Sequence, residues 1–252
     1  MTTFERLLKT RKERGAGFLV LIDPDKTHPD SLPRFVESAT GVGVDGFLVG
    51  GSLMLRDGFD RHLAIIKDHT DVPVIIFPGS LFQVSPEADA ILFLVLISGR
   101  NPEHLIGNQV MAAPIIRHLG LEAISTGYML IGTGTTTAAE YMSNTRPIPH
   151  DKPDIAVAHG IAAETIGMKC LYLDAGSGAA QSIPDPMIQA LARHSSLPII
   201  VGGGIRTPED ARRKVVAGAS FVVAGTVMEK DGQTSLLREF AEAIHVPSTV
   251  KS

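Results

Sequence analysis

The chain has 252 residues, of which 44% are hydrophobic and 20% are charged, and its formal net charge is −4. This is the composition of an ordinary soluble globular protein without a basic stripe, so we expect no nucleic-acid partner. The single cysteine excludes an internal disulfide, and no apolar run approaches the roughly 20 residues of a membrane span. We expect a cytoplasmic protein that an apolar substrate could bring into transient membrane contact.

Short apolar runs alternate with longer amphipathic runs along the chain. The short runs predict eight strands, at residues 18–22, 46–49, 74–77, 91–97, 122–131, 171–173, 199–201 and 221–224. Helices are expected near the N-terminus and at residues 31–39, 59–68, 102–119, 155–167, 186–194, 208–217 and 235–244. Eight such units in about 250 residues predict one domain, residues 1–252, with the fold of a (β/α)₈ TIM barrel. An open doubly wound sheet is the alternative.

Two connections depart from this pattern. Residues 78–89, PGSLFQVSPEAD, contain two prolines and leave little room for a helix, so a loop is expected to replace the helix after the third strand. Residues 132–153 are rich in Thr, Pro and Gly and are long enough to have a function or to form an interface.

Glycine-rich turns follow the last two predicted strands. Gly203 and Gly204 end the seventh strand, and Gly225 and Thr226 end the eighth. In barrels these two strand ends commonly bind phosphate, because glycine lets backbone N–H groups approach an anion beside a helix N-terminus. A glycine run by itself could also be a plain tight turn, but two such turns on consecutive strands favour phosphate binding.

A third turn of this kind follows the sixth strand, in the sequence YLDAGSG. Gly176 and Gly178 free the backbone, and Ser177 supplies a hydroxyl group. Asp174 lies in the same turn, where a carboxylate beside a phosphate is unfavourable unless it has a task such as accepting a proton. The alternative is that Asp174 only caps the turn.

Two turns at the other side of the predicted barrel carry oxygen donors. Asp23, Asp25 and Lys26 follow the first strand, and Ser52 follows the second. Mg²⁺ prefers oxygen ligands and often binds through one or two carboxylates plus substrate phosphates. A solvated Asp-Pro-Asp turn and a helix N-cap are the simpler interpretations of these residues.

Taken together, the motifs LIDPDK, FLVGGS, YLDAGSG, VGGGI and VAGT resemble those of the geranylgeranylglyceryl phosphate synthase family. That family includes archaeal ether-lipid enzymes and related bacterial heptaprenylglyceryl phosphate synthases, and the resemblance spans residues 18–226. VGGGI alone is shared by many phosphate-binding barrels, whereas its combination with YLDAGSG is more specific. The family fold is a barrel that lacks the helix after strand three, in agreement with the loop predicted above.

The resemblance implies a prenyltransferase that joins the 3-hydroxyl of sn-glycerol 1-phosphate to a prenyl diphosphate, geranylgeranyl diphosphate being expected. It implies Mg²⁺ as cofactor, held by Asp23 and Ser52, and Asp174 as the catalytic proton acceptor. The residues implied to bind sn-glycerol 1-phosphate are Tyr172, Leu173, Asp174, Ala175, Gly176, Ser177, Gly178, Gly203, Gly204, Gly225 and Thr226.

Two positions depart from the family pattern. Most members have Glu where this chain has Asp174, which would set the acceptor about one methylene further back. Some members have Lys where this chain has Leu21, and its absence indicates the second of the two sequence groups, which tends to assemble beyond dimers. We therefore expect a homo-oligomer, either a dimer or a hexamer.

The prenyl tail requires an apolar trough, which the missing helix would expose beside strands three and four. The candidate side chains are Phe77, Leu81, Phe82, Leu92, Leu94 and Leu96. Two other functions stay open: another phosphate-binding barrel enzyme, such as a sugar-phosphate isomerase or epimerase, and a non-catalytic binder of a phosphorylated metabolite.

Overall fold

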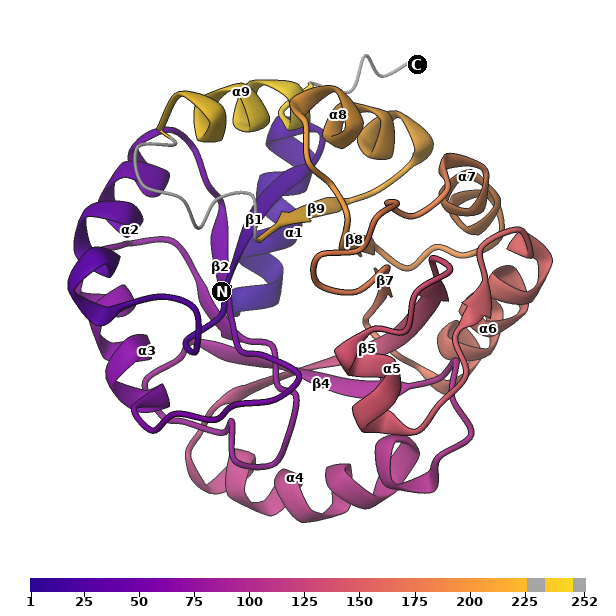
Figure 1. Cartoon of the computed structure of the whole chain (residues 1–252), viewed down its shortest axis with the longest axis horizontal. Coiled ribbons are helices and arrows are strands. Elements are labelled where there is room, and N and C mark those ends of the chain that lie inside the picture. The colour runs from indigo at the N-terminus through magenta and orange to yellow at the C-terminus, as the bar shows by residue number, and fades with distance from the viewer. Residues whose placement is uncertain (226–233, 247–252) are drawn as a thin grey trace.

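The computed structural model describes residues 1–225 and 234–246, and it forms a closed barrel of eight parallel strands inside a ring of helices (Figure 1). The order around the barrel is β1, β2, β3, β4, β5, β7, β8, β9 and back to β1. Their bounds are β1 (Gly17–Ile22), β2 (Gly46–Val49), β3 (Val74–Ile76), β4 (Ala90–Leu96), β5 (Glu122–Gly132), β7 (Cys170–Asp174), β8 (Ile199–Gly202) and β9 (Phe221–Ala224). The predicted barrel is confirmed.

The helices agree closely with the predicted amphipathic runs. They are α1 (Thr3–Arg14), α2 (Leu32–Gly41), α3 (Phe59–Asp68), α4 (Asn108–His118), α5 (Ala138–Ser143), α6 (Pro153–Ile166), α7 (Asp185–His194), α8 (Pro208–Ala217) and α9 (Thr234–Ile244). A 3-10 turn, η1 (Pro29–Ser31), precedes α2, and a π-helical turn, η2 (Glu103–Gly107), precedes α4. Across the described ranges, no helix combines the length and the apolar character that crossing a bilayer requires.

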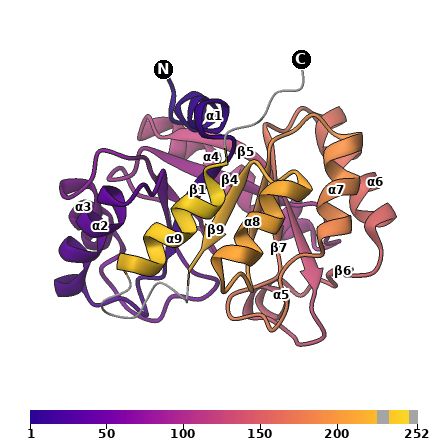
Figure 2. The same ribbon diagram turned by 90° about the horizontal axis from the view of Figure 1, so that it is seen from above.

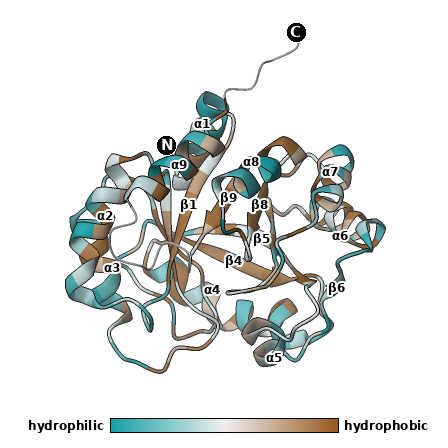
Figure 3. Ribbon diagram, turned by 45° about the horizontal axis from the view of Figure 1, so that its top comes forward, coloured by the Kyte–Doolittle hydropathy of each residue, from teal (hydrophilic) through white to brown (hydrophobic). Residues whose placement is uncertain are grey.

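Alternation along the strands divides the apolar side chains into two cores, and the strands are the most hydrophobic part of the ribbon (Figure 3). Side chains such as Leu19, Leu48 and Ile200 fill the inside of the barrel. Side chains such as Phe18 and Phe47 point outward and pack beneath the helices. A barrel with a filled interior and a covered exterior is rigid, which is what positions the loops at its carboxyl end.

No helix connects β3 to β4 between residues 77 and 89, as the two prolines predicted. Gln83 holds this connection in place although its residues form no regular structure. The buried Gln83 amide accepts hydrogen bonds from the backbone N–H groups of Gly51 and Gly79, both at 3.2 Å, and donates one to the Gly51 carbonyl at 2.8 Å. The loops after β2 and β3 are therefore fixed to each other.

The irregular stretch between β5 and α6 contains more structure than the sequence predicted. It forms the short helix α5, which Thr137 caps by accepting from the Glu140 backbone N–H at 3.2 Å. It also forms a two-residue strand, β6 (Ile148–Pro149), paired with the end of β5. Both elements are shorter than the windows over which hydrophobic periodicity can be recognised.

Helix α1 covers the amino-terminal end of the barrel, opposite to α5 (Figure 2). It begins with a capping box between Thr2 and Glu5. The Glu122 carboxylate at the start of β5 accepts from the backbone N–H groups of Thr3 and Phe4, at 2.6 and 3.3 Å. With Leu7 buried in the inner core, α1 closes this end of the barrel.

Candidate active site

A cavity of about 810 Å³ lies at the carboxyl ends of the strands and extends beside β4. Its lining brings together side chains and turns that the sequence analysis selected from five separate motifs. The predicted site residues on its wall are Asp23, Lys26, Ser52, Tyr172, Asp174, Ser177, Gly178, Gly203, Gly204 and Gly225. Residues that are up to 200 positions apart in the chain thus form a single site.

Three of the predicted residues are not on this wall, and a fourth is not described by the structure. The side chains of Leu173 and Ala175 are buried in the outer core, under the helices. The Gly176 backbone N–H donates to Asp174 at 2.7 Å and is spent within the turn. Thr226 lies outside the described residues. For Leu173 and Ala175, the alternation of a strand explains the placement, since every second side chain faces away from the barrel interior.

The turns after β7 and β8 are in direct backbone contact. Gly203 and Gly204 have φ values of 83° and 70°, a region that favours glycine. A Cβ atom at Gly203 would lie 2.7 Å from the backbone nitrogen of Gly176. Helix α8 begins beside this contact, and Thr207 caps it by accepting from the Asp210 N–H at 3.1 Å. Exposed backbone donors and a helix N-terminus make these turns after β7 and β8 suitable for a phosphate group. We call them the headgroup corner.

Asp174 is the buried carboxylate of the site, with 8% of its surface exposed. The Tyr128 hydroxyl donates to its Oδ2 at 2.5 Å, and the Gly176 N–H donates to its Oδ1. Burial raises the pKa of Asp174 above its ordinary value, and the hydrogen bonds from Tyr128 and Gly176 oppose that rise. The result is an oriented carboxylate that is a stronger base than an exposed aspartate.

Tyr128 is a site residue that the sequence analysis missed. It lies on β5 in register with Tyr172 on β7, so its hydroxyl reaches Asp174 two residues further along. Burial, together with the negative charge of Asp174, raises the pKa of both tyrosines, so their hydroxyls remain protonated. The inward alternation of β5 was the available signal, but it did not reveal the pairing with β7.

Three aromatic rings form the floor beneath the headgroup corner. Phe77 stacks on Tyr172 with ring centroids 4.7 Å apart, and Tyr128 meets both rings edge-on, at 5.8 and 5.6 Å. These rings connect β3, β5 and β7 across the barrel. They separate the polar rim from the apolar interior below, so a charged headgroup is held at the rim.

The predicted metal-binding residues are arranged around one carboxylate and not two. Asp23 faces the cavity, with its Oδ2 2.8 Å from Lys26 Nζ and its Oδ1 accepting from the Asp25 N–H at 3.1 Å. Asp25 instead accepts from the backbone N–H groups of Leu55 and Arg56, at 2.6 and 3.1 Å. Asp25 therefore fixes the loop that follows Ser52.

The oxygen donors near Asp23 suit Mg²⁺ only together with ligands from outside the protein. Within residues 1–225 and 234–246 no three His, Cys, Asp or Glu side chains gather as a metal cluster. Asp23 and Ser52 nevertheless offer a carboxylate and a hydroxyl oxygen on one cavity wall, beside Gly51. Mg²⁺ commonly binds through one carboxylate, water and substrate phosphates, so these residues fit a metal that arrives with a phosphorylated ligand.

An apolar trough continues the cavity past β4. Both faces of that strand line it, because no helix covers the outer face between β3 and β4. The predicted trough residues Phe77, Leu81, Leu92, Leu94 and Leu96 are on its wall, together with Val84, Ile91, Phe93, Ala112 and Ile116. Phe82 was wrongly assigned to the trough: its side chain is 93% exposed, since the loop turns it outward.

Helix α5 adds a wall that the sequence analysis did not foresee. Ala138, Ala139 and Met142 line the cavity from above β4 and β5. The stretch between β5 and α6 thus has the functional placement that its length suggested. At the outer end of the trough, His104, Asn108 and Gln109 add polar atoms. Burial lowers the pKa of His104, which favours the neutral imidazole.

Comparisons with known proteins agree with this geometry. The profile described as the PcrB family matches residues 8–244. The chain belongs to the PcrB family. The geranylgeranylglyceryl phosphate synthase of Chitinophaga pinensis is 48% identical over 241 residues, which cover 95% of each chain. That of Methanothermobacter marburgensis is 40% identical over 227 residues, or 90% of this chain and 92% of the other.

A solved structure of a geranylgeranylglyceryl phosphate synthase is also similar over nearly its whole length. The crystal structure of (S)-3-O-geranylgeranylglyceryl phosphate synthase from Thermoplasma acidophilum, in complex with its substrate sn-glycerol-1-phosphate, has a TM-score of 0.92. It is 33% identical in sequence, and the match covers 97% of this chain and 99% of that one. The resemblance predicted from the motifs is therefore confirmed.

Proposed function

We propose that this PcrB-family chain is a prenyltransferase of ether-lipid biosynthesis. It joins the 3-hydroxyl of sn-glycerol 1-phosphate to C1 of a long prenyl diphosphate, geranylgeranyl diphosphate being our candidate, and releases diphosphate. The observation that carries the proposal is that one cavity joins the glycine-lined headgroup corner, a buried carboxylate and an apolar trough. The names of the relatives and the ligand of the Thermoplasma acidophilum structure support the same chemistry.

The headgroup corner would orient the acceptor substrate. Backbone donors of the turns that contain Ser177, Gly178, Gly203 and Gly204 bind the phosphate, which fixes the glycerol hydroxyl near Asp174. As the bond from this oxygen to C1 forms, the C1–diphosphate bond breaks and its electron pair leaves with diphosphate. Asp174 accepts the hydroxyl proton, and Tyr128 holds the carboxylate in position.

The turns after β1 and β2 would hold the departing diphosphate. Asp23 and Ser52 are the residues that would bind Mg²⁺, and Lys26, which is 2.8 Å from Asp23, adds a positive charge on the same side. Bound Mg²⁺ supplies Lewis-acid stabilisation of the negative charge on the leaving group. Asp23 would thus hold the metal while it pairs with Lys26, so that both positive charges would face the diphosphate.

The direct test is incubation with sn-glycerol 1-phosphate and a series of C15 to C35 prenyl diphosphates in the presence of Mg²⁺, read by mass spectrometry. We expect one new product, the mono-ether of glycerol phosphate, with a maximum at C20. Absence of product at every chain length would contradict the proposal. Turnover of a sugar phosphate in its place would support an isomerase or epimerase, whereas ligand binding without any turnover would support a non-catalytic binder.

Asp23→Ala tests the metal side separately. We expect Mg²⁺-dependent turnover to be abolished while circular dichroism and glycerol 1-phosphate binding are unchanged, because Asp23 follows β1 whereas the headgroup corner is built from the turns after β7 and β8. Asp30→Ala is a matched control, since Asp30 is exposed and lies beyond the same turn. Unchanged turnover of Asp23→Ala would remove the metal assignment.

We further propose that the chain acts in the cytoplasm as a homo-oligomer, a dimer or a hexamer. The motif group indicated by Leu21 supports assembly, and light scattering of the purified protein at micromolar concentration tests it. A monomeric mass under those conditions would contradict this part of the proposal.

A further inference from the structure

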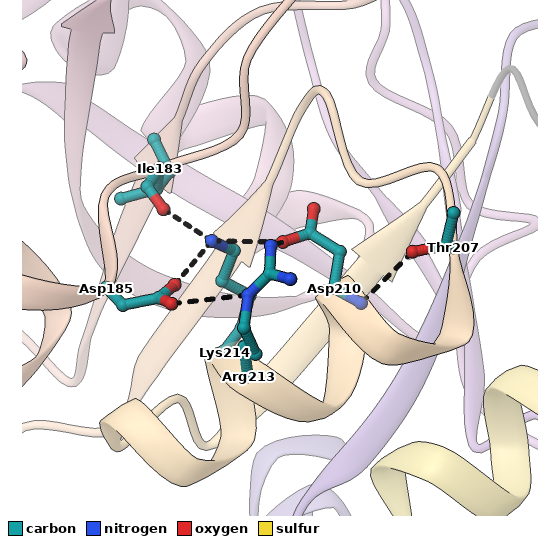
Figure 4. Close-up of polar contacts among 6 residues, drawn as sticks. All are labelled: Ile183, Asp185, Thr207, Asp210, Arg213 and Lys214. Carbon is teal, nitrogen blue, oxygen red and sulfur yellow. Dashed lines mark hydrogen bonds and ion pairs between the residues drawn. The ribbon is translucent and has the colours of Figure 1, made fainter.

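A buried lysine that does not line the cavity holds the headgroup corner together. The Lys214 side chain on α8 is 3% exposed. Its Nζ donates to the Ile183 carbonyl at 2.7 Å and to Asp185 Oδ1 at 2.6 Å, and lies 3.3 Å from Asp210 Oδ1. Figure 4 shows these contacts converging on one ammonium group between α8 and the start of α7.

The charges of this cluster balance within it. Arg213 contacts both carboxylates, Asp210 at 2.6 Å and Asp185 at 3.4 Å, so two cations face two anions (Figure 4). An ion network around a buried lysine contributes little net stability compared with a well-packed apolar cluster, because the lysine and its partners must be desolvated. A single defined position for the segments that it joins is the property that distinguishes it.

The segment that Lys214 holds is the one that runs from β7 to α7 and carries Ser177 and Gly178. Near its start, Arg206 donates to the Ala179 carbonyl at 2.9 Å. In its middle, it packs so closely on Gly204 that a Cβ atom there would lie 2.5 Å from the Gln181 carbonyl oxygen. At its end, Lys214 Nζ donates a hydrogen bond to the Ile183 carbonyl.

All three anchors come from the β8–α8 unit, which itself supplies Gly203 and Gly204. The spacing between the two turns of the headgroup corner, after β7 and after β8, is therefore set by contacts outside the cavity. We propose that Lys214 is a positioning residue for glycerol phosphate: it holds the segment after β7 at the distance from β8 at which both turns can donate to one phosphate. This inference rests on the proposed function, since it concerns the same site.

Lys214→Met is the principal test, with steady-state kinetics for each substrate and calorimetry with sn-glycerol 1-phosphate alone. A small displacement of positioned groups has large kinetic effects. We expect the KM and the Kd for glycerol phosphate to rise about tenfold or more, with kcat and the KM for prenyl diphosphate each within about twofold. Hydrogen exchange of the amides of residues 176–182 should accelerate, which a readout of activity alone would not reveal.

Two further variants keep the result interpretable. Lys214→Met/Asp185→Asn leaves the Asp210–Arg213 pair, so that no unpaired charge is buried, and we expect the same rise in KM if Lys214→Met alone folds poorly. Lys67→Met removes a lysine of α3 that is also 2.6 Å from an aspartate, Asp89, which precedes β4 and lies away from the corner. It should leave the KM for glycerol phosphate unchanged.

The outcomes separate the two proposals. Wild-type enzyme that binds and converts glycerol phosphate, together with a folded Lys214→Met variant of unchanged KM and Kd, would overturn the positioning role alone. An equal rise in Lys67→Met would overturn it as well, because the effect would then be general destabilisation. Wild-type protein that neither binds nor converts glycerol phosphate would overturn the proposed function itself.

Discussion

At the scale of single residues, Asp174 is the group to which we assign proton transfer. Both of its oxygens accept a hydrogen bond from the protein, yet the residue still faces the cavity. Asp174→Asn keeps the shape of the side chain and removes its basicity. We expect kcat to fall by about 10²-fold or more, the usual contribution of a general base, with glycerol phosphate binding retained by calorimetry. A loss below about fivefold would leave Asp174 as a turn residue only.

The raised pKa of Asp174 has a consequence for the pH profile. Asp174 must be ionised to accept a proton, so the acid limb of kcat/KM should lie above the ordinary aspartate value of 3.8. The hydrogen bond from Tyr128 lowers this pKa, so Tyr128→Phe should raise it and move the acid limb to higher pH. Tyr141→Phe, at a tyrosine that is 78% exposed, should leave the limb in place. A limb unmoved in Tyr128→Phe would show that another group controls it.

Glycine turns, Asp174 and Asp23 could be predicted as candidate site residues because each belongs to a short contiguous motif. Tyr128 could not, because its contact with Asp174 depends on the register between β5 and β7. Asp25 was named beside Asp23 as an oxygen donor that could hold Mg²⁺; it lines the cavity, and it also accepts from Leu55 and Arg56 on another loop. In each case the deciding partner is distant in sequence and was invisible in the motif.

At the scale of elements, the crossing of the loops after β2 and β3 is the tightest part of the site. A Cβ atom at Gly79 would clash with the Gly51 carbonyl oxygen, so the two backbones touch. Gly79→Ala should push them apart at a cost of about 1–3 kcal/mol, the range for overpacking. Because Gly51 adjoins Ser52 and Asp23, we expect the KM for prenyl diphosphate to rise about tenfold, with little change for glycerol phosphate.

Gly41→Ala is the matched control for this substitution. Nothing lies within 4 Å of a Cβ atom at Gly41, which ends α2, so neither stability nor KM should change. If Gly79→Ala also leaves both KM values unchanged in a folded protein, the loop crossing does not position the diphosphate side.

The sequence predicted the absence of a helix after β3, but it did not predict α5 or β6. The two prolines of residues 78–89 correctly excluded a helix there, because proline restricts the backbone locally. Helix α5 and strand β6 were missed because six-residue and two-residue elements are stabilised by their tertiary contacts and carry no periodic pattern. Phe82 was misplaced for a related reason, since the direction of a loop side chain has no periodicity to predict it.

At the scale of the whole molecule, ligand binding and folding are coupled. A ligand that binds only the folded chain stabilises it by about 2.7 kcal/mol at one hundred times its Kd. We therefore expect sn-glycerol 1-phosphate without metal to raise the Tm by several degrees in calorimetry. Glycerol at the same concentration should have far less effect, since it lacks the phosphate that we propose the glycine turns bind. Equal increases in Tm from both compounds would argue against phosphate binding at the headgroup corner.

The closed amino-terminal end of the barrel determines where ligands can enter and leave. Leu19, Leu48 and Ile200 fill the interior under the aromatic rings, and α1 shuts the end beyond them. In the proposed reaction, reactants and products would therefore pass through the opening above the strands or along the uncovered flank of β4. An amphiphilic product would leave tail-first along that flank, while free diphosphate would return through the opening above the strands and compete there with incoming prenyl diphosphate.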